Sequence, residues 1–149
     1  EVPYRRMVLK VVAVHEARSV GYELELSDGW YSICTTIDGG LANAIERGVI
    51  KLGTKLVISC AELRNCNGFD PLHMPSTVRL KISSNSTRKV TDWSLKLGFC
   101  RDPKQIRVPL DSVLMSGGVI GKMRLVVTHV YQLIYVDSNG DKKGKRFSN

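Results

Sequence analysis

The feature that most constrains this chain is an alternating run that ends at Asp28-Gly29. Leucine and glutamate alternate over residues 22–27, so one face of this segment would be buried and the other would meet water. Asp-Gly between two such runs is a strong hairpin signal, because both residues tolerate positive φ. The return strand is predicted over residues 30–37, which makes an antiparallel hairpin with one buried face. The inward side chains of the return strand would be Tyr31, Ile33 and Ile37.

Three further strands and one helix complete a small barrel. Apolar and β-branched runs predict strands over residues 6–16, 55–63 and 77–83. A short helix is predicted between the third and fourth strands, because Asp38 can cap its first turn and Gly48 can end it. Strands and helix in this order are typical of an all-β OB-fold, a five-stranded Greek-key barrel. One face of the first strand would be formed by Met7, Leu9, Val11 and Ala13.

The residues after the fifth strand exceed what this barrel needs and form a C-terminal extension. A long strand is predicted over residues 122–136, and it is apolar on both faces. Such a strand needs cover on both sides, so we expect a neighbouring domain to pack there. We therefore assign residues 1–136 to the OB-fold domain and residues 137–149 to a polar tail or to the start of the following domain. The chain begins with Glu1 rather than Met, and we expect it to be part of a longer protein.

The positive charge of the chain is concentrated in its second half. Residues 1–78 hold 8 Lys and Arg against 9 Asp and Glu, whereas residues 79–149 hold 14 against 5. Such asymmetry favours a polyanionic partner, either nucleic acid or an acidic protein segment. The alternative is a basic surface that keeps the protein in solution and has no specific ligand.

The residues that could carry catalysis or bind a metal are scattered along the chain. The histidines lie on separate predicted elements, the first two of them in loops, and the cysteines form no Cys-x-x-Cys pair. We expect reduced cysteines, most of them in the core. No apolar run approaches the roughly 20 residues of a membrane span. We therefore expect no enzyme activity, no cofactor, no metal and no membrane contact. The residues concerned are His15, His73 and His129, and Cys34, Cys60, Cys66 and Cys100.

The outer face of the second and third strands, where OB-folds bind single-stranded nucleic acid, is poorly suited to phosphate. Glu23 and Glu25 lie on this face and would repel it. The cations come later in the chain, together with two tryptophans as candidate stacking rings. Each ring has another interpretation: Trp30 could pack against a neighbouring domain, and Trp93 could anchor the extra segment in the core. The candidate residues for binding nucleic acid or an acidic partner are Trp30, Arg79, Lys81, Arg88, Lys89, Trp93, Lys96 and Arg101.

Several stretches of the sequence resemble one protein family. They are ELSDGWY at 25–31, CAEL at 60–63, LKISSNSTR at 80–88, KLGF at 96–99 and SGG at 116–118. Over roughly residues 5–136 the chain resembles the first OB-fold domain of the breast cancer type 2 susceptibility protein family, a family of recombination mediators. The connection over residues 15–21 is shorter than in some relatives.

The resemblance implies a function in homologous recombination in the nucleus. Members of the family deliver a RecA-like recombinase to single-stranded DNA, and their DNA-binding region joins a helical domain to several OB-folds. The first OB-fold and the helical domain hold a small, very acidic partner, the deleted-in-split-hand/split-foot protein. Single-stranded DNA is bound more by the later OB-folds, so weak DNA binding is implied for this domain alone. The resemblance thus implies a non-catalytic docking module. The alternative is a module that itself binds single-stranded DNA or another polyanion through residues 79–107.

Overall fold

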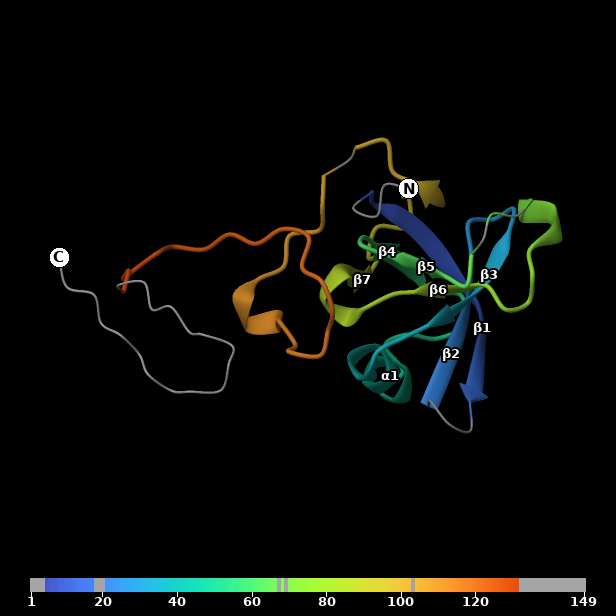
Figure 1. The fold of residues 1–149 in the computed structure, drawn as a ribbon, viewed down its shortest axis with the longest axis horizontal. Coiled ribbons are helices and arrows are strands. Elements are labelled where there is room, and N and C mark those ends of the chain that lie inside the picture. The colour runs from blue at the N-terminus through green and yellow to red at the C-terminus, as the bar shows by residue number, and fades with distance from the viewer. Residues whose placement is uncertain (1–4, 18–20, 67, 69, 103, 132–149) are drawn as a thin grey trace, which may run out of the picture.

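One curled sheet forms the centre of the described chain (Figure 1). The computed structural model describes residues 5–17, 21–66, 68, 70–102 and 104–131. Short 3-10 turns at Pro71–His73, Ser84–Ser86 and Leu110–Ser112 interrupt the connections. The strands are β1 (Met7–Ala17), β2 (Gly21–Ser27), β3 (Ser32–Thr36), β4 (Lys55–Ile58), β5 (Glu62–Arg64), β6 (Arg79–Lys81), β7 (Thr87–Lys89) and β8 (Gly98–Phe99), and the helix is α1 (Gly39–Glu46).

The sheet curls into a barrel because the fourth predicted strand is broken into two. The strand order is β5-β6-β3-β2-β1-β4-β7, so β4 and β5 lie near opposite ends of the path although they are consecutive in the chain. Between them Cys60 adopts a φ of 55°, a left-handed conformation that turns the chain sharply. The predicted all-β OB-fold, with a short helix between the third and fourth strands, is confirmed. The single strand predicted over 55–63 is wrong and is replaced by β4 and β5.

The core is formed by the side chains that alternation predicts to face inward. Leu24 and Leu26 of β2 are fully buried, and Leu56 and Ile58 of β4 join the same cluster. Burying a side chain of this size contributes about 2 kcal/mol. The cluster therefore holds the meander of β1, β2 and β3 against the second half of the barrel. Its other buried members are Leu9, Val11, Leu41, Ile50, Leu80 and Ile82.

The inward face of β1 changes at Val12. Val11 and Ala13 pair with successive residues of β2, so Val12 is an extra residue that forms a β-bulge. After the bulge Val14, rather than Ala13, packs against the core. The prediction that Ala13 shares the face of Val11 is wrong, because alternation does not continue across an extra residue.

The hairpin between β2 and β3 has a longer turn than predicted. β3 begins at Ser32 instead of Trp30. The Asp28 carboxylate accepts hydrogen bonds from the backbone N–H groups of Trp30 and Tyr31, both at 2.9 Å, and so fixes the turn. As a result Tyr31 is 48% exposed and does not face inward as predicted.

The segment after β6 differs from the prediction at both ends. β7 pairs with β4, and β8 pairs with the start of β1, so the basic segment begins inside the sheet. By contrast, residues 122–131 form no strand apart from one bridge between Arg107 and Lys122. The long strand predicted over 122–136 is therefore wrong in its described part, where no strand lies alongside to pair with its backbone. Residues 132–149, which include the predicted tail, lie outside the described residues.

Asp38 joins the helix to the end of β6. One oxygen of its carboxylate caps α1 through the N–H of Leu41 at 3.0 Å. The other oxygen accepts two hydrogen bonds from Ser84, from the N–H at 2.7 Å and from the hydroxyl at 2.9 Å. A single side chain thus starts the helix, as predicted, and also fixes the chain between β6 and β7.

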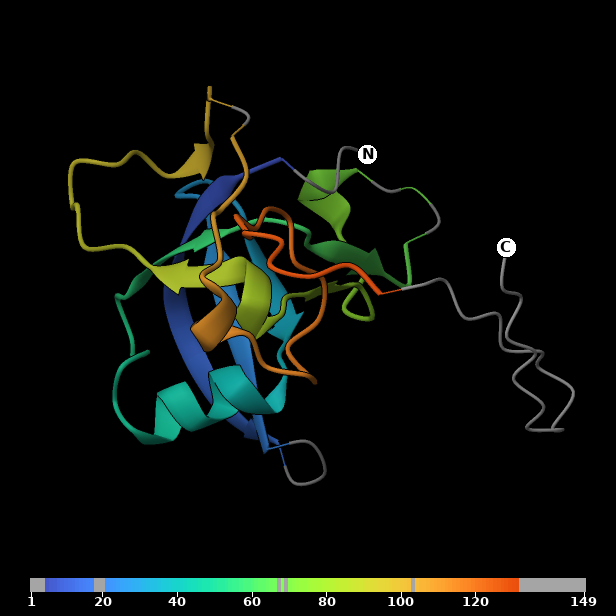
Figure 2. The same cartoon turned by 90° about the vertical axis from the view of Figure 1, so that its left-hand side faces the viewer.

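Next to Ser84, the Asn85 side chain binds the C-terminal extension (Figure 2, orange). The side chain is only 2% exposed. Its Nδ2 donates to the carbonyl oxygens of Leu114 and Gly118, at 2.9 and 3.0 Å, and its Oδ1 accepts from the N–H of Leu114 at 2.9 Å. Gly117 is required here, because a Cβ on it would lie 2.6 Å from Asn85 Oδ1. We call Asp38, Ser84 and Asn85 the polar network.

The polar network predicts a large loss of stability for Asn85→Ala. Truncation removes three part-buried hydrogen bonds and leaves two carbonyls and one N–H without the Asn85 amide, so we expect the free energy of unfolding to fall by about 2 kcal/mol. Urea unfolding followed by far-UV circular dichroism measures this change. The exposed Asn43 on α1 offers a matched control, since Asn43→Ala should leave the midpoint nearly unchanged. Equal midpoints for the two variants would contradict the role given to Asn85.

Candidate binding surface

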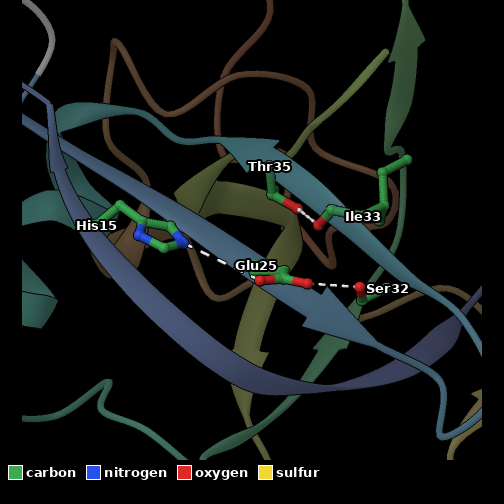
Figure 3. Close-up of polar contacts among 5 residues, drawn as sticks. All are labelled: His15, Glu25, Ser32, Ile33 and Thr35. Carbon is green, nitrogen blue, oxygen red and sulfur yellow. Dashed lines mark hydrogen bonds and ion pairs between the residues drawn. The ribbon is translucent and has the colours of Figure 1, made fainter. Parts of the chain in front are cut away.

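The outer face of β2 and β3, which we call the platform, carries carboxylates at its centre. Glu23 pairs with Thr36 and Glu25 pairs with Cys34. Ser32 Oγ donates to Glu25 Oε1 at 2.5 Å, and His15 Nε2 lies 4.0 Å from Glu25 Oε2. Figure 3 shows both side chains directed at the Glu25 carboxylate. Glu25 is thus held in place on this face, where it would repel a phosphate group.

The prediction that His15 lies in a loop is wrong: His15 belongs to β1, on its platform side. It pairs with Glu23 in the antiparallel ladder. β1 continues to Ala17, and the connection to β2 is only residues 18–20, which lie outside the described residues. Thr35 points the other way: it is fully buried, and its hydroxyl donates to the carbonyl of Ile33 at 3.2 Å (Figure 3).

Two of the predicted binding cations, Arg79 and Lys81, lie beside the platform. β6 pairs with β3 in parallel, with Lys81 next to Thr36. Lys81 also faces Glu62 across the ladder to β5. The guanidinium of Arg79 donates to the carbonyls of Ser76 and Val78, so part of its hydrogen-bonding capacity is already used. The platform region therefore mixes acids and bases and does not form a single positive groove.

Arg88 and Lys89 lie on β7, on the far side of β4 from the platform strands. Arg88 binds the protein itself: its guanidinium donates to the carbonyls of Ser84 and Thr87, at 2.6 and 2.8 Å, and to Ser112 Oγ at 3.3 Å. Lys89 is exposed and leads into the following loop. Of these two predicted residues, Lys89 is the one available to a ligand.

Trp93 is held in an exposed loop by Lys55 of β4. Lys55 Nζ donates to the carbonyl oxygens of Trp93 and Leu95, at 3.0 and 2.9 Å, and lies 5.7 Å from the centre of the Trp93 ring. The ring remains 67% exposed, so Trp93 does not anchor the extra segment in the core. Its backbone is fixed while one large aromatic surface meets water.

The structure brings the turn after β2 against the same loop. A Cβ on Gly29 would lie 3.5 Å from Leu97 Cδ1, so the turn contacts the residue after Lys96. Trp30 in this turn is 91% exposed. Arg101 follows β8 and is also exposed. The predicted residues thus separate into Arg79 and Lys81 beside the platform, and a second group that includes Trp30, Trp93 and Lys96. Lys89 belongs to neither group, because it pairs with the buried Leu56 and so leaves the sheet on the opposite face from Lys55.

Lys10 and Lys55 belong to this second group and were not predicted from the sequence. They are directly opposed in the ladder between β1 and β4, and Lys10 also pairs with Ser27 at the start of the turn. Each is a single lysine in an apolar run, so nothing local in the sequence distinguishes it. Only the pairing of strands far apart in the chain shows that they are neighbours. We call Lys10, Trp30, Lys55, Trp93 and Lys96 the lysine–tryptophan patch.

The described residues contain few groups suited to other chemistry. Among them no cluster of three or more His, Cys, Asp or Glu side chains could hold a metal ion. The four thiols are free, and burial raises the pKa of the Cys60 thiol. Cys60 is the only buried one, so the prediction that most cysteines lie in the core is wrong. None of the described helices is long and apolar enough to cross a membrane.

The sequence matches the family model described as "BRCA2, oligonucleotide/oligosaccharide-binding, domain 1" over residues 1–101. The chain belongs to the BRCA2 family. Protein BREAST CANCER SUSCEPTIBILITY 2 homolog B of Arabidopsis thaliana is 33% identical over 126 residues, which cover 81% of this chain and 11% of that protein. Homolog A of the same plant is 32% identical over 126 residues, which again cover 81% of this chain and 11% of that protein. The chain therefore spans about a ninth of the length of these relatives.

The match confirms the resemblance found in the sequence motifs. Within the BRCA2 family this chain corresponds to the first OB-fold domain. The polar network uses residues of two of those motifs, Ser84 and Asn85 in LKISSNSTR and Gly117 and Gly118 in SGG. These motifs therefore mark the joint between the barrel and its extension.

The loop that carries Trp93 should loosen in acid. Hydrogen bonds from Ser94, with a smaller contribution from Lys55, lower the pKa of Asp92 below its ordinary value of 3.8. The folded loop thus favours the charged carboxylate, so this stabilisation is present above pH 3.8 and is lost as the pH falls through the lowered pKa. Trp30→Phe leaves Trp93 as the only tryptophan. In that variant, the fluorescence anisotropy of Trp93 should fall in acid before the far-UV circular dichroism changes.

The matched variant for this test is Asp92→Asn in the same Trp30→Phe background. It removes the charge at every pH and should show the low anisotropy already at neutral pH. Anisotropy that follows only global unfolding, in both proteins, would contradict a role of Asp92 in ordering the loop.

Proposed function

We propose that this domain is a non-catalytic OB-fold module of a homologous-recombination DNA-repair protein that acts in the nucleus. It forms part of the single-stranded-DNA-binding region of that protein and docks a small acidic partner of the deleted-in-split-hand/split-foot type. One observation carries this proposal: carboxylates occupy the centre of the platform, while exposed cations lie on β7 and the following loop.

An acidic partner fits this distribution of charge better than a DNA strand laid across the platform. A strand there would bring phosphates to Glu23 and Glu25, which costs binding energy. A chain of carboxylates that approaches Lys89, Lys96 and Arg101 meets exposed cations instead. Single-stranded DNA then binds weakly to this domain alone and more strongly to other domains of the full protein, which also contact the RecA-like recombinase.

Neighbouring domains are part of the same proposal. Leu125, Val126, Val127, Val130 and Tyr131 are each at least 60% exposed in the described extension. Exposed apolar side chains in succession favour cover by another domain. The helical and OB-fold neighbours of the full protein would supply that cover, with residues 1–136 as the domain and 137–149 as a polar tail or the lead into the next one.

A second candidate function is direct binding of single-stranded DNA, or another polyanion, through residues 79–107. The observation in its favour is the exposure of Trp30 and Trp93 close to lysines. Stacking rings and cations are what single strands require. The two functions predict different behaviour when DNA and the acidic partner are offered together.

Charge reversal at Lys89, Lys96 and Arg101 tests the docking function. Replacing all three by Glu should weaken binding of the acidic partner by about tenfold or more at low salt, measured by titration with labelled partner. Arg88 is left in place, because its guanidinium binds protein carbonyls and its loss would confuse binding with stability. The same reversal at the exposed Arg47, Lys104 and Lys122 is the matched control.

Competition between labelled single-stranded DNA and the partner completes the test. If the partner binds equally to both triple variants and to the unchanged chain, also when the helical domain is restored, the docking proposal is wrong. If DNA binds tightly and the partner does not displace it or bind itself, the second candidate is the better description.

A further inference from the structure

The two tryptophans of this chain are both exposed, which is unusual for the largest apolar side chain. Trp30 is 91% and Trp93 is 67% exposed. A soluble protein gains stability by burying such rings, so two exposed ones on adjoining segments indicate a contact surface.

Both rings are carried by backbone that is already fixed. The turn that holds Trp30 is tied by two hydrogen bonds to Asp28 and rests against Leu97. The loop that holds Trp93 is tied by the two hydrogen bonds from Lys55. Rings presented in this way lose little conformational entropy when a ligand covers them.

The acids nearest to the rings are occupied, whereas the lysines are not. Asp28 accepts hydrogen bonds in the turn, and Asp92 accepts one from the N–H of Ser94 at 2.9 Å. Within the part of the chain that the structure describes, no carboxylate lies within ion-pair distance of Lys10 or Lys96. The patch therefore offers exposed rings and unneutralised ammonium groups together.

We propose that the lysine–tryptophan patch is a contact site for single-stranded nucleic acid that lies off the platform. Trp30 and Trp93 each stack one base, and Lys10 and Lys96 contact the phosphates. Lys55 is a positioning residue that holds the Trp93 loop. This inference rests on the second candidate function and gives it a location.

The chemistry of the patch favours a nucleic acid over an acidic peptide. Every base has a flat face that can stack on an exposed ring, and its phosphates need only point charges, which lysines supply. A peptide gains most of its specific affinity from anchor side chains buried in pockets. Both rings of the patch project into solvent instead.

The test uses the 149-residue chain and a fluorescein-labelled oligothymidylate of about 12 nucleotides, a length within the range that one OB-fold contacts. Binding is measured by anisotropy over a series of salt concentrations. Trp30→Ala and Trp93→Ala should each weaken binding about tenfold. Lys96→Met should reduce the slope of log K against log salt by about 0.7, the value expected for one phosphate contact to a single strand.

Lys81→Met is the matched control, since it removes the same charge from β6 beside the platform. It should leave both the affinity and the slope unchanged. If Lys81→Met weakens binding and the tryptophan variants do not, the strand lies on the platform and the proposal is overturned. If the chain is folded and no oligonucleotide binds at low salt, the second candidate function fails as well, so the two failures are distinguishable.

The role of Lys55 has its own readout. In the Trp30→Phe background, the oligonucleotide should quench the fluorescence of Trp93, and Lys55→Met should abolish the quenching without lowering the urea midpoint by more than Lys96→Met does. Lys55→Arg, which retains donors for the carbonyls of Trp93 and Leu95, should restore it. Quenching that survives Lys55→Met would overturn the positioning role.

An acidic peptide is the remaining competitor for the patch. An oligoglutamate with the same number of charges as the oligothymidylate serves as its probe. If the peptide binds as tightly and depends on Trp30 and Trp93 to the same degree, the patch recognises acidic protein rather than nucleic acid, and the proposal is overturned.

Discussion

The hydrogen bonds of Asp38 and Asn85 decide where the second half of this chain lies. Asp38 holds Ser84 against the start of α1, and Asn85 holds the extension at Leu114 and Gly118. The chain is therefore fixed on both sides of the 3-10 turn at Ser84–Ser86, directly before β7. A buried amide that satisfies three backbone groups at once specifies one geometry, because any shift leaves a polar group unpaired. The position of β7 and of the basic loop after it follows from this joint.

That position separates the cations of the chain into two sets with different surroundings. β6 lies next to β3, so Arg79 and Lys81 share their region with the acids of the platform and of β5. β7 pairs with β4, so the loop that follows β7 lies toward Lys55 and Lys10. The net charge of the sequence does not reveal this division. The separation of the cations into two sets explains why the domain is strongly basic overall and yet acidic at the centre of the face where OB-folds bind their ligands.

Much of the barrel could be predicted from the sequence, because its signals are local. The alternation of Leu24 and Leu26 and the capping Asp38 act over a few residues and were interpreted correctly. The bulge at Val12 and the break at Cys60 could not be predicted, since both depend on the pairing of distant strands. For the same reason, the sequence does not show that Lys10 and Lys55 are neighbours. The sequence therefore predicted which kinds of residue form the candidate site. It could not show that the cations separate into two groups, that Arg88 binds backbone carbonyls of the protein itself, or that Trp93 is exposed.

We propose that this domain binds polyanions on the lysine–tryptophan patch and not on the platform. Backbone amide chemical shifts, followed residue by residue during titration with oligothymidylate, test it most directly. Binding at the patch predicts the largest changes over residues 28–31 and 90–97, with small changes at Glu23, Glu25 and Cys34. The opposite pattern, with the largest changes on β2 and β3 and none in the loop of Trp93, would contradict it.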